Sequence, residues 1–155
     1  MPALETDTVV LEAEANAAVI AHFNMVQAVI ARLNGNSSSC KTWAIAVVGA
    51  LIGLAGSAKA PAIALFALAP ALILSGIDAY YLALERAFRH LFNAKAVRLR
   101  EGSYRRADLF DLKPASVAGK PFWEAVASPS VASVYGLLLV ASVLAYVGLR
   151  MTVCS

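Results

Sequence analysis

Charged residues, histidine and cysteine are all scarce in this chain of 155 residues. Only 15% of the residues are charged and 60% are hydrophobic, whereas a soluble domain has about 25% charged and about 45–50% apolar residues. One core cannot bury this surplus, because a domain of this length leaves around 30% of its chain surface exposed. The composition therefore argues against an ordinary soluble domain and favours one compact domain embedded in a lipid bilayer.

The two cysteines and two histidines provide little for metal or redox chemistry. Cys40 precedes the first apolar run and Cys154 follows the last, with no CxxC pair, so we expect no disulfide framework, metal or cofactor. We expect His22 and His90 to be ordinary surface residues. No nucleophile–base–acid arrangement, paired carboxylate pocket or glycine-rich phosphate loop is visible, so we do not expect an enzyme. The start of the chain is acidic where a cleavable secretory signal is basic.

Residues 8–34 have the pattern of an amphipathic helix. Their apolar residues form a seam at spacings of four and three for about two heptads, comprising Val19, Phe23, Val26, Ile30 and Leu33. This seam suits packing within one subunit and contact between subunits equally well. Gly35, Asn36 and the serines that follow predict the end of this helix, and Ser38 or Ser39 is expected to cap the next one.

Three uncharged apolar runs follow and predict membrane-spanning helices, namely Trp43–Ala58, Ala62–Ile77 and Val131–Leu149. The first two are joined by a tight turn that ends at Pro61, which suits the first position of a helix. Pro70 should kink the second run or loosen one turn. Asp78–Arg100 contains no glycine or proline, so one long helix is expected to continue from the second run into the cytosol.

The predicted fold is an all-α integral membrane protein with three transmembrane helices, a cytosolic amphipathic N-terminal helix and a long helical extension of the second span. Residues 79–128 carry nine basic and five acidic residues, so we expect this stretch and the N-terminus in the cytosol and the C-terminus outside. The expected segments are 1–36 (N-terminal helix), 37–100 (membrane hairpin and extension), 101–128 (cytosolic or interfacial loop) and 129–155 (third span and tail).

The basic stretch is the best ligand candidate. Arginine binds phosphates through two parallel hydrogen bonds, and Tyr104 among the arginines suits stacking of a base. Attraction to anionic lipid headgroups explains the same residues, and so does a plain topology signal. The candidate anion-binding residues are Arg86, Arg89, Lys95, Arg98, Arg100, Arg105 and Arg106.

Three further positions are singled out within the spans. Asp78 ends an apolar run, where a carboxylate is costly unless it is paired or hydrated. It is either an interfacial acid paired with an arginine of a neighbouring helix or one member of a ring of acids at a pore mouth, with Pro70 as part of the gate. Gly49 and Gly53 form a GxxxG pair, which lets membrane helices approach closely in a homo-oligomer.

The hairpin Trp43–Ile77, followed by a charged helix that reads DAYYLALERAFR from Asp78 to Arg89, resembles the SLATT-type small membrane proteins of bacteria, and among them the effectors of Hailong defence systems. The resemblance covers about residues 37–100, and the third span and the long N-terminal helix depart from it. It implies a homo-oligomeric channel or pore of anti-phage defence that depolarises an infected cell in abortive infection. A nucleotide or oligonucleotide made by a partner nucleotidyltransferase would control this channel.

Two other functions fit the same sequence. A membrane-anchored adaptor would dock a partner protein through residues 8–34 and 79–120. A holin-like lytic protein fits less well, because holins usually carry their basic tail at the C-terminus and the basic residues here are central.

Overall fold

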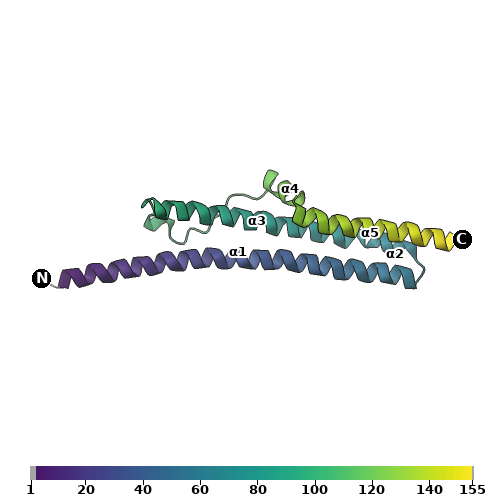
Figure 1. Cartoon of the computed structure of the whole chain (residues 1–155), viewed down its shortest axis with the longest axis horizontal. Helices are drawn as coiled ribbons and strands as arrows, with labels where there is room; N and C mark the ends of the chain where they lie inside the picture. The colour runs from purple at the N-terminus through teal and green to yellow at the C-terminus, as the bar shows by residue number, and fades with distance from the viewer. Residues whose placement is uncertain (1–2, 155) are drawn as a thin grey trace. The chain divides into compact units, whose positions relative to one another are not determined.

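The computed structural model describes residues 3–154, and the side chains of residues 15–152. Its elements, in chain order, are α1 (Ala3–Ser57), α2 (Pro61–Phe66), α3 (Leu68–Arg100), the 3-10 helix η1 (Arg106–Asp108), α4 (Lys120–Val126) and α5 (Pro129–Cys154) (Figure 1). The described part of the chain contains no strand, which confirms the all-helical fold class.

Three helical segments of the described chain are long and apolar enough to cross a membrane, namely Ala15–Ser57, Pro61–Arg100 and Pro129–Thr152. A helix rises about 1.5 Å per residue and a bilayer has a hydrocarbon core about 30 Å thick. With 26 residues, α5 exceeds that thickness. The prediction of three membrane-type helices is therefore confirmed.

The chain divides into two compact units. Unit 1 comprises Met1–Arg32 and Glu85–Ser116, and unit 2 comprises Leu33–Leu84 and Val117–Ser155. Because α1 and α3 are long, each contributes one part to unit 1 and another to unit 2. Unit 2 contains the uncharged runs, and unit 1 contains eight of the nine basic residues of segment 79–128.

Unit 2 is held together by small apolar contacts between its helices. Buried Ala44 of α1 packs with Val131 and Tyr135 of α5, and buried Val48 packs with Ala67 and Ala71. In a third cluster the short helix α4 packs on α3, through Ala79, Ala83 and Ala125. Small side chains at these contacts let the helix backbones lie close together, as in membrane bundles. The large apolar side chains therefore remain on the outer faces.

The expected helix end at Gly35–Ser39 is wrong, because α1 continues through it to Ser57. The Ser39 hydroxyl does not cap a new helix but donates a hydrogen bond to the Gly35 carbonyl one turn earlier, at 2.9 Å. Serine can bond back in this way inside a helix. Ser37 and Cys40 are buried at helical spacing from Leu33, so packing along this face explains why weak helix formers are retained in α1. The expected separate N-terminal helix is thus the first part of a longer element.

The expected turn between the first two spans is present. α1 ends at Ser57, Lys59 has a positive φ of 50°, and α2 begins at Pro61. The helix is interrupted again at Ala67, between α2 and α3. Pro70 explains this second break, because it has no N–H to donate to the carbonyl one turn earlier and its ring crowds that carbonyl. The helix is therefore continuous from Leu68 to Arg100 and not, as expected, from about Ala62.

In unit 1, α1 packs on α3 through aromatic side chains. The rings of Phe23 and Phe92 meet edge to face with centroids 5.1 Å apart, a favoured aromatic geometry. Of the expected seam in this unit, Val26 is buried, whereas Val19, Phe23 and Ile30 are half-buried. The segment after α3 packs beside His22 and Phe23, as the ring contacts of Tyr104 and Phe110 show.

Candidate functional site

A buried ion pair links two helices of unit 2. The Lys41 ammonium of α1 lies 2.7 Å from Oδ2 and 3.0 Å from Oδ1 of Asp78 on α3. The Ser37 hydroxyl also donates to Asp78, and the Lys41 ammonium donates to the Ser37 oxygen at 2.9 Å. Asp78 is fully buried, whereas the Lys41 side chain is 19% exposed. A carboxylate in an apolar helix needs such a partner, so the pair is a specific bond between α1 and α3.

The partner of Asp78 differs from the arginine that the sequence suggested. It is Lys41, which lies just before the first uncharged run. Tyr135 of α5 is also buried and lies near the Asp78 carboxylate. Within one chain the Asp78 carboxylate faces the interior of unit 2 and not a free surface. A role for Asp78 and Pro70 in a pore stays a prediction.

In unit 1, a second ionic cluster fastens the segment after α3. The Lys95 ammonium lies 2.7 Å from the Asp108 carboxylate and 3.0 Å from that of Asp111, and Arg98 lies 2.7 Å from Asp108. The Lys95 side chain is only 7% exposed. Hydrogen bonds from Lys95 and from the Arg105 backbone lower the pKa of Asp108 to about 2. The hydrogen bond from Lys95 also lowers the pKa of Asp111.

His22 fastens the same segment from α1. It is fully buried, and its Nδ1 accepts a hydrogen bond of 2.8 Å from the Phe110 backbone N–H. Because Nδ1 is the acceptor, a neutral ring carries its proton on Nε2. The expectation of a surface histidine is therefore wrong for His22, because the returning segment covers it, while His90 is exposed as expected. Phe110 itself has a φ of 59°, in the left-handed region that a residue with a bulky side chain rarely adopts.

A hollow of about 510 Å³ lies between α1 and this fastened segment. We call it the 104–110 hollow. Its walls are apolar residues of α1, two aromatic rings and two arginines, among them Ala18, Val19, Tyr104, Arg105, Arg106 and Phe110. This size is within the range of small-molecule sites. Burial raises the pKa of the Tyr104 phenol, so its hydroxyl stays neutral at physiological pH.

The other candidate anion-binding residues differ in availability. Arg86 and Arg100 are exposed and have no ion pair with a described residue, whereas Arg89 is paired with Glu85 at 2.7 Å. Lys95 is occupied by Asp108 and Asp111, and Arg98 is partly engaged. The arrangement therefore brings only Arg105 and Arg106 of the seven into the 104–110 hollow.

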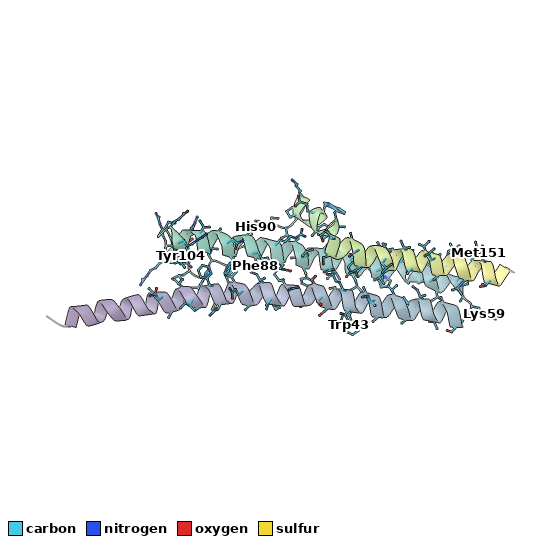
Figure 2. The ribbon with its side chains drawn as sticks, in the orientation of Figure 1. Trp43, Lys59, Phe88, His90, Tyr104 and Met151 are labelled. Carbon is cyan, nitrogen blue, oxygen red and sulfur yellow. The ribbon has the colours of Figure 1, made fainter. Side chains whose placement is uncertain are left out.

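The predicted packing motif, Gly49 and Gly53, has no contact partner among the described residues. Gly49 and Gly53 lie on an exposed face of α1, and a Cβ built at either position would have no atom within 4 Å. Trp43 of the same helix is 65% exposed and points away from α1 (Figure 2). Contact between copies at this glycine face stays a prediction.

Sequence reasoning missed Lys41, His22, Asp108, Asp111 and Phe110. A signal existed for Lys41 and Asp78, because they lie at nearly equal distances from the turn at Lys59 in an antiparallel hairpin. For His22 and the two aspartates no local pattern shows how the chain returns after Arg100. Among the described residues, no group of histidine, cysteine, aspartate or glutamate is arranged to hold a metal ion.

Comparison with known proteins finds no matching family model, no matching curated protein and no matching solved structure. The class that the fold defines is therefore an all-helical protein with three helices of membrane-spanning length and composition. Function has to be argued from the residues themselves.

Proposed function

We propose that the chain is a homo-oligomeric membrane channel or pore whose opening is controlled by an anionic ligand bound to basic residues on its cytosolic side. The proposal rests on two observations taken together. Several arginines outside the uncharged runs have no ion pair with a described residue, and one chain leaves large apolar faces exposed. The exposed apolar side chains include Leu54, Phe66, Leu72, Leu137 and Leu144. Lipid or further copies of the chain would cover them.

Two features of unit 2 suit assembly into a pore. The exposed Gly49–Gly53 face of α1 is free for close helix contact with another copy. The Lys41–Asp78 pair satisfies a charge that would otherwise be costly in lipid, so unit 2 tolerates a carboxylate at the end of its apolar region. In an oligomer, these pairs would recur by symmetry once in every subunit.

The ligand class follows from the arginines. Arginine is suited to planar, two-point contacts with phosphate, so a nucleotide or oligonucleotide is the ligand we propose. α3 carries both Asp78 and the basic residues from Arg86 to Arg100, and a ligand controls a pore if it binds one state more tightly than the other. The proposed orientation, with the N-terminus cytosolic and the C-terminus outside, rests on the basic residues of 79–128. The proposed placement in the bacterial inner membrane rests on the resemblance of residues 37–100 to bacterial SLATT-type proteins. The SLATT-like pattern of residues 37–100 supports a role in anti-phage defence through depolarisation.

The test replaces Arg86, Arg89, Arg100, Arg105 and Arg106 together by glutamine. Arg98 and Lys95 are left intact because they fasten Asp108. The matched control replaces the exposed Lys113 and Lys120 by glutamine. We expect the variant with five substitutions to keep its oligomer size in detergent. We expect it to lose binding of a short fluorescent single-stranded oligonucleotide and to lose ligand control of depolarisation in bacterial cells. If oligonucleotide binding and ligand control of depolarisation are both unchanged, the arginines act only as a topology signal or as a lipid contact.

Orientation needs a different test from the one the two native cysteines suggest. Cys40 is buried, so a labelling reagent would reach it poorly whichever side it faces. The neighbouring Ser38 is exposed. Ser38→Cys in a background with Cys40→Ser and Cys154→Ser should react from the cytosolic side, and labelling from the outside would contradict the proposed orientation.

An adaptor remains the second candidate because of two side chains on α1. Ile20 is 60% exposed and Met25 is 45% exposed, and both lie in unit 1, away from the uncharged runs. Such side chains suit a partner helix. Ile20→Ser with Met25→Ser should leave depolarisation intact if the chain acts as a channel, and should abolish function if it acts by docking a partner.

A further inference from the structure

We infer that the 104–110 hollow is a nucleotide-binding pocket in which Arg105 and Arg106 hold a phosphate group and the rings of Phe110 and Tyr104 contact a base. This inference rests on the proposed function for the class of ligand, and it assigns the binding to one loop instead of the whole row of basic residues. The loop is held by several contacts, its two aspartates are paired, and its unpaired arginines line one hollow.

The loop is fixed at three points around the residue with the strained backbone. Asp108, two residues before Phe110, binds Lys95, Arg98 and the Arg105 backbone N–H. Phe110 donates its backbone N–H to His22, and Asp111 binds Lys95 at 3.0 Å. A φ of 59° at phenylalanine costs free energy and persists only where the surroundings impose it. Such strain is common at binding sites, where it holds side chains in the bound geometry.

The same contacts determine which side chains of the loop remain unpaired and exposed. The carboxylates of Asp108 and Asp111 are used by Lys95 and Arg98, so they do not neutralise Arg105 and Arg106. Neither Arg105 nor Arg106 has an ion pair with a described residue, and both are exposed. Phe110 is 56% exposed although aromatic. Two cations without ion pairs and an exposed ring are therefore held next to one another on this loop.

The hollow itself has room and chemistry for such a ligand. Its volume of about 510 Å³ is sufficient for a mononucleotide unit. Ala18 and Val19 of α1 provide an apolar floor beside the two aromatic rings. The Tyr104 hydroxyl is buried without a hydrogen-bond partner among the described residues, which is uncommon and leaves a donor for a ligand or water.

The experiment measures binding of a short fluorescein-labelled single-stranded oligonucleotide to the full chain in detergent over a range of salt concentrations. Each phosphate that the protein neutralises on a single strand contributes about 0.7 to the slope of log affinity against log salt. Because Arg105 and Arg106 hold one phosphate, Arg105→Gln with Arg106→Gln should lower that slope by about 0.7 and weaken binding at least about tenfold at low salt. The charge-matched control, Lys113→Gln with Lys120→Gln, should leave both unchanged. Phe110→Asn tolerates the positive φ but lacks the ring, and should weaken binding about fivefold or more without changing the slope.

The outcomes separate this inference from the proposed function. If the variant with five arginine substitutions loses binding while the variant with only Arg105→Gln and Arg106→Gln binds like wild type, the site assignment is wrong and the proposed function stands. If wild type binds no oligonucleotide, both are wrong. A parallel measurement uses vesicles of phosphatidylglycerol with phosphatidylcholine. If the pair variant loses vesicle association and keeps oligonucleotide binding, the two arginines contact lipid headgroups and the inference is overturned.

Discussion

Removing Lys41 should destabilise unit 2 far more than removing its partner Asp78. In Lys41→Met the fully buried Asp78 carboxylate loses its cationic partner, although it keeps the hydrogen bond from Ser37. Breaking a buried pair in this way costs about 3–5 kcal/mol, and we expect the lower end because the Lys41 side chain is 19% exposed and the pair is not completely dry. In Asp78→Asn the amide retains a partner in Ser37, and the lysine can extend towards water, so the cost should be about 1–2 kcal/mol.

The double variant Lys41→Met with Asp78→Asn decides whether the two residues act as a pair. No uncompensated charge remains, so its stability should lie within about 1 kcal/mol of Asp78→Asn alone, with a coupling of at least about 2 kcal/mol. Unfolding in detergent micelles can be followed by circular dichroism and by the fluorescence of Trp43, two residues from Lys41. Additive effects of the two changes, or a Lys41→Met variant as stable as Asp78→Asn, would refute the ion pair as a bond between α1 and α3.

Two further predictions concern the loop and the assembly. The pKa of Asp108 is lowered from 3.8 to about 2. The stabilisation that the ionised Asp108 carboxylate gives the loop is therefore complete above pH 3.8, and it is lost as the pH falls towards about 2. Pepsin should therefore cut near Leu109 and Phe110 increasingly as the pH falls through this range, and Asp108→Asn should be cut readily already at its upper end. Gly49→Leu and Gly53→Leu should reduce oligomer size in mild detergent without unfolding the chain, since a Cβ at either position would have no described atom within 4 Å. A monomeric wild type would contradict assembly.

The helical runs could be predicted because each has a strong local cause. A long uncharged run predicts a membrane-type helix, and the turn at Pro61 and the interruption before Pro70 follow from the missing N–H and fixed φ of proline. The prediction of a helix end at Gly35–Ser39 was wrong because local helix propensity is weak compared with the packing of buried side chains. Leu33, Ser37 and Cys40 lie on one buried face of α1, and burial of that face compensates for poor helix formers.

The candidate site could be predicted only in part, since it depends on where the chain goes after Arg100. The sequence identified the arginines and Tyr104 as one cluster, but not the residues that determine which arginines remain unpaired. Asp108 and His22 are far apart in the sequence, and they meet only because the loop returns to α1 and α3. No spacing rule connects a histidine in a long helix with a backbone N–H in a later loop. The Lys41–Asp78 pair, by contrast, could have been found from the symmetry of the hairpin.

Carboxylates within the fold determine which of the seven predicted basic residues remain available to an anion. Asp108 and Asp111 occupy Lys95 and engage Arg98, and Glu85 occupies Arg89. The formal charge of segment 79–128 therefore overstates the number of free cations. Of those left without an ion pair among the described residues, Arg86 and Arg100 lie on the exposed surface of α3, where solvent and salt weaken their attraction for a ligand. Arg105 and Arg106 line a hollow with aromatic walls, so a phosphate held there would be partly shielded from water and its contacts would be stronger.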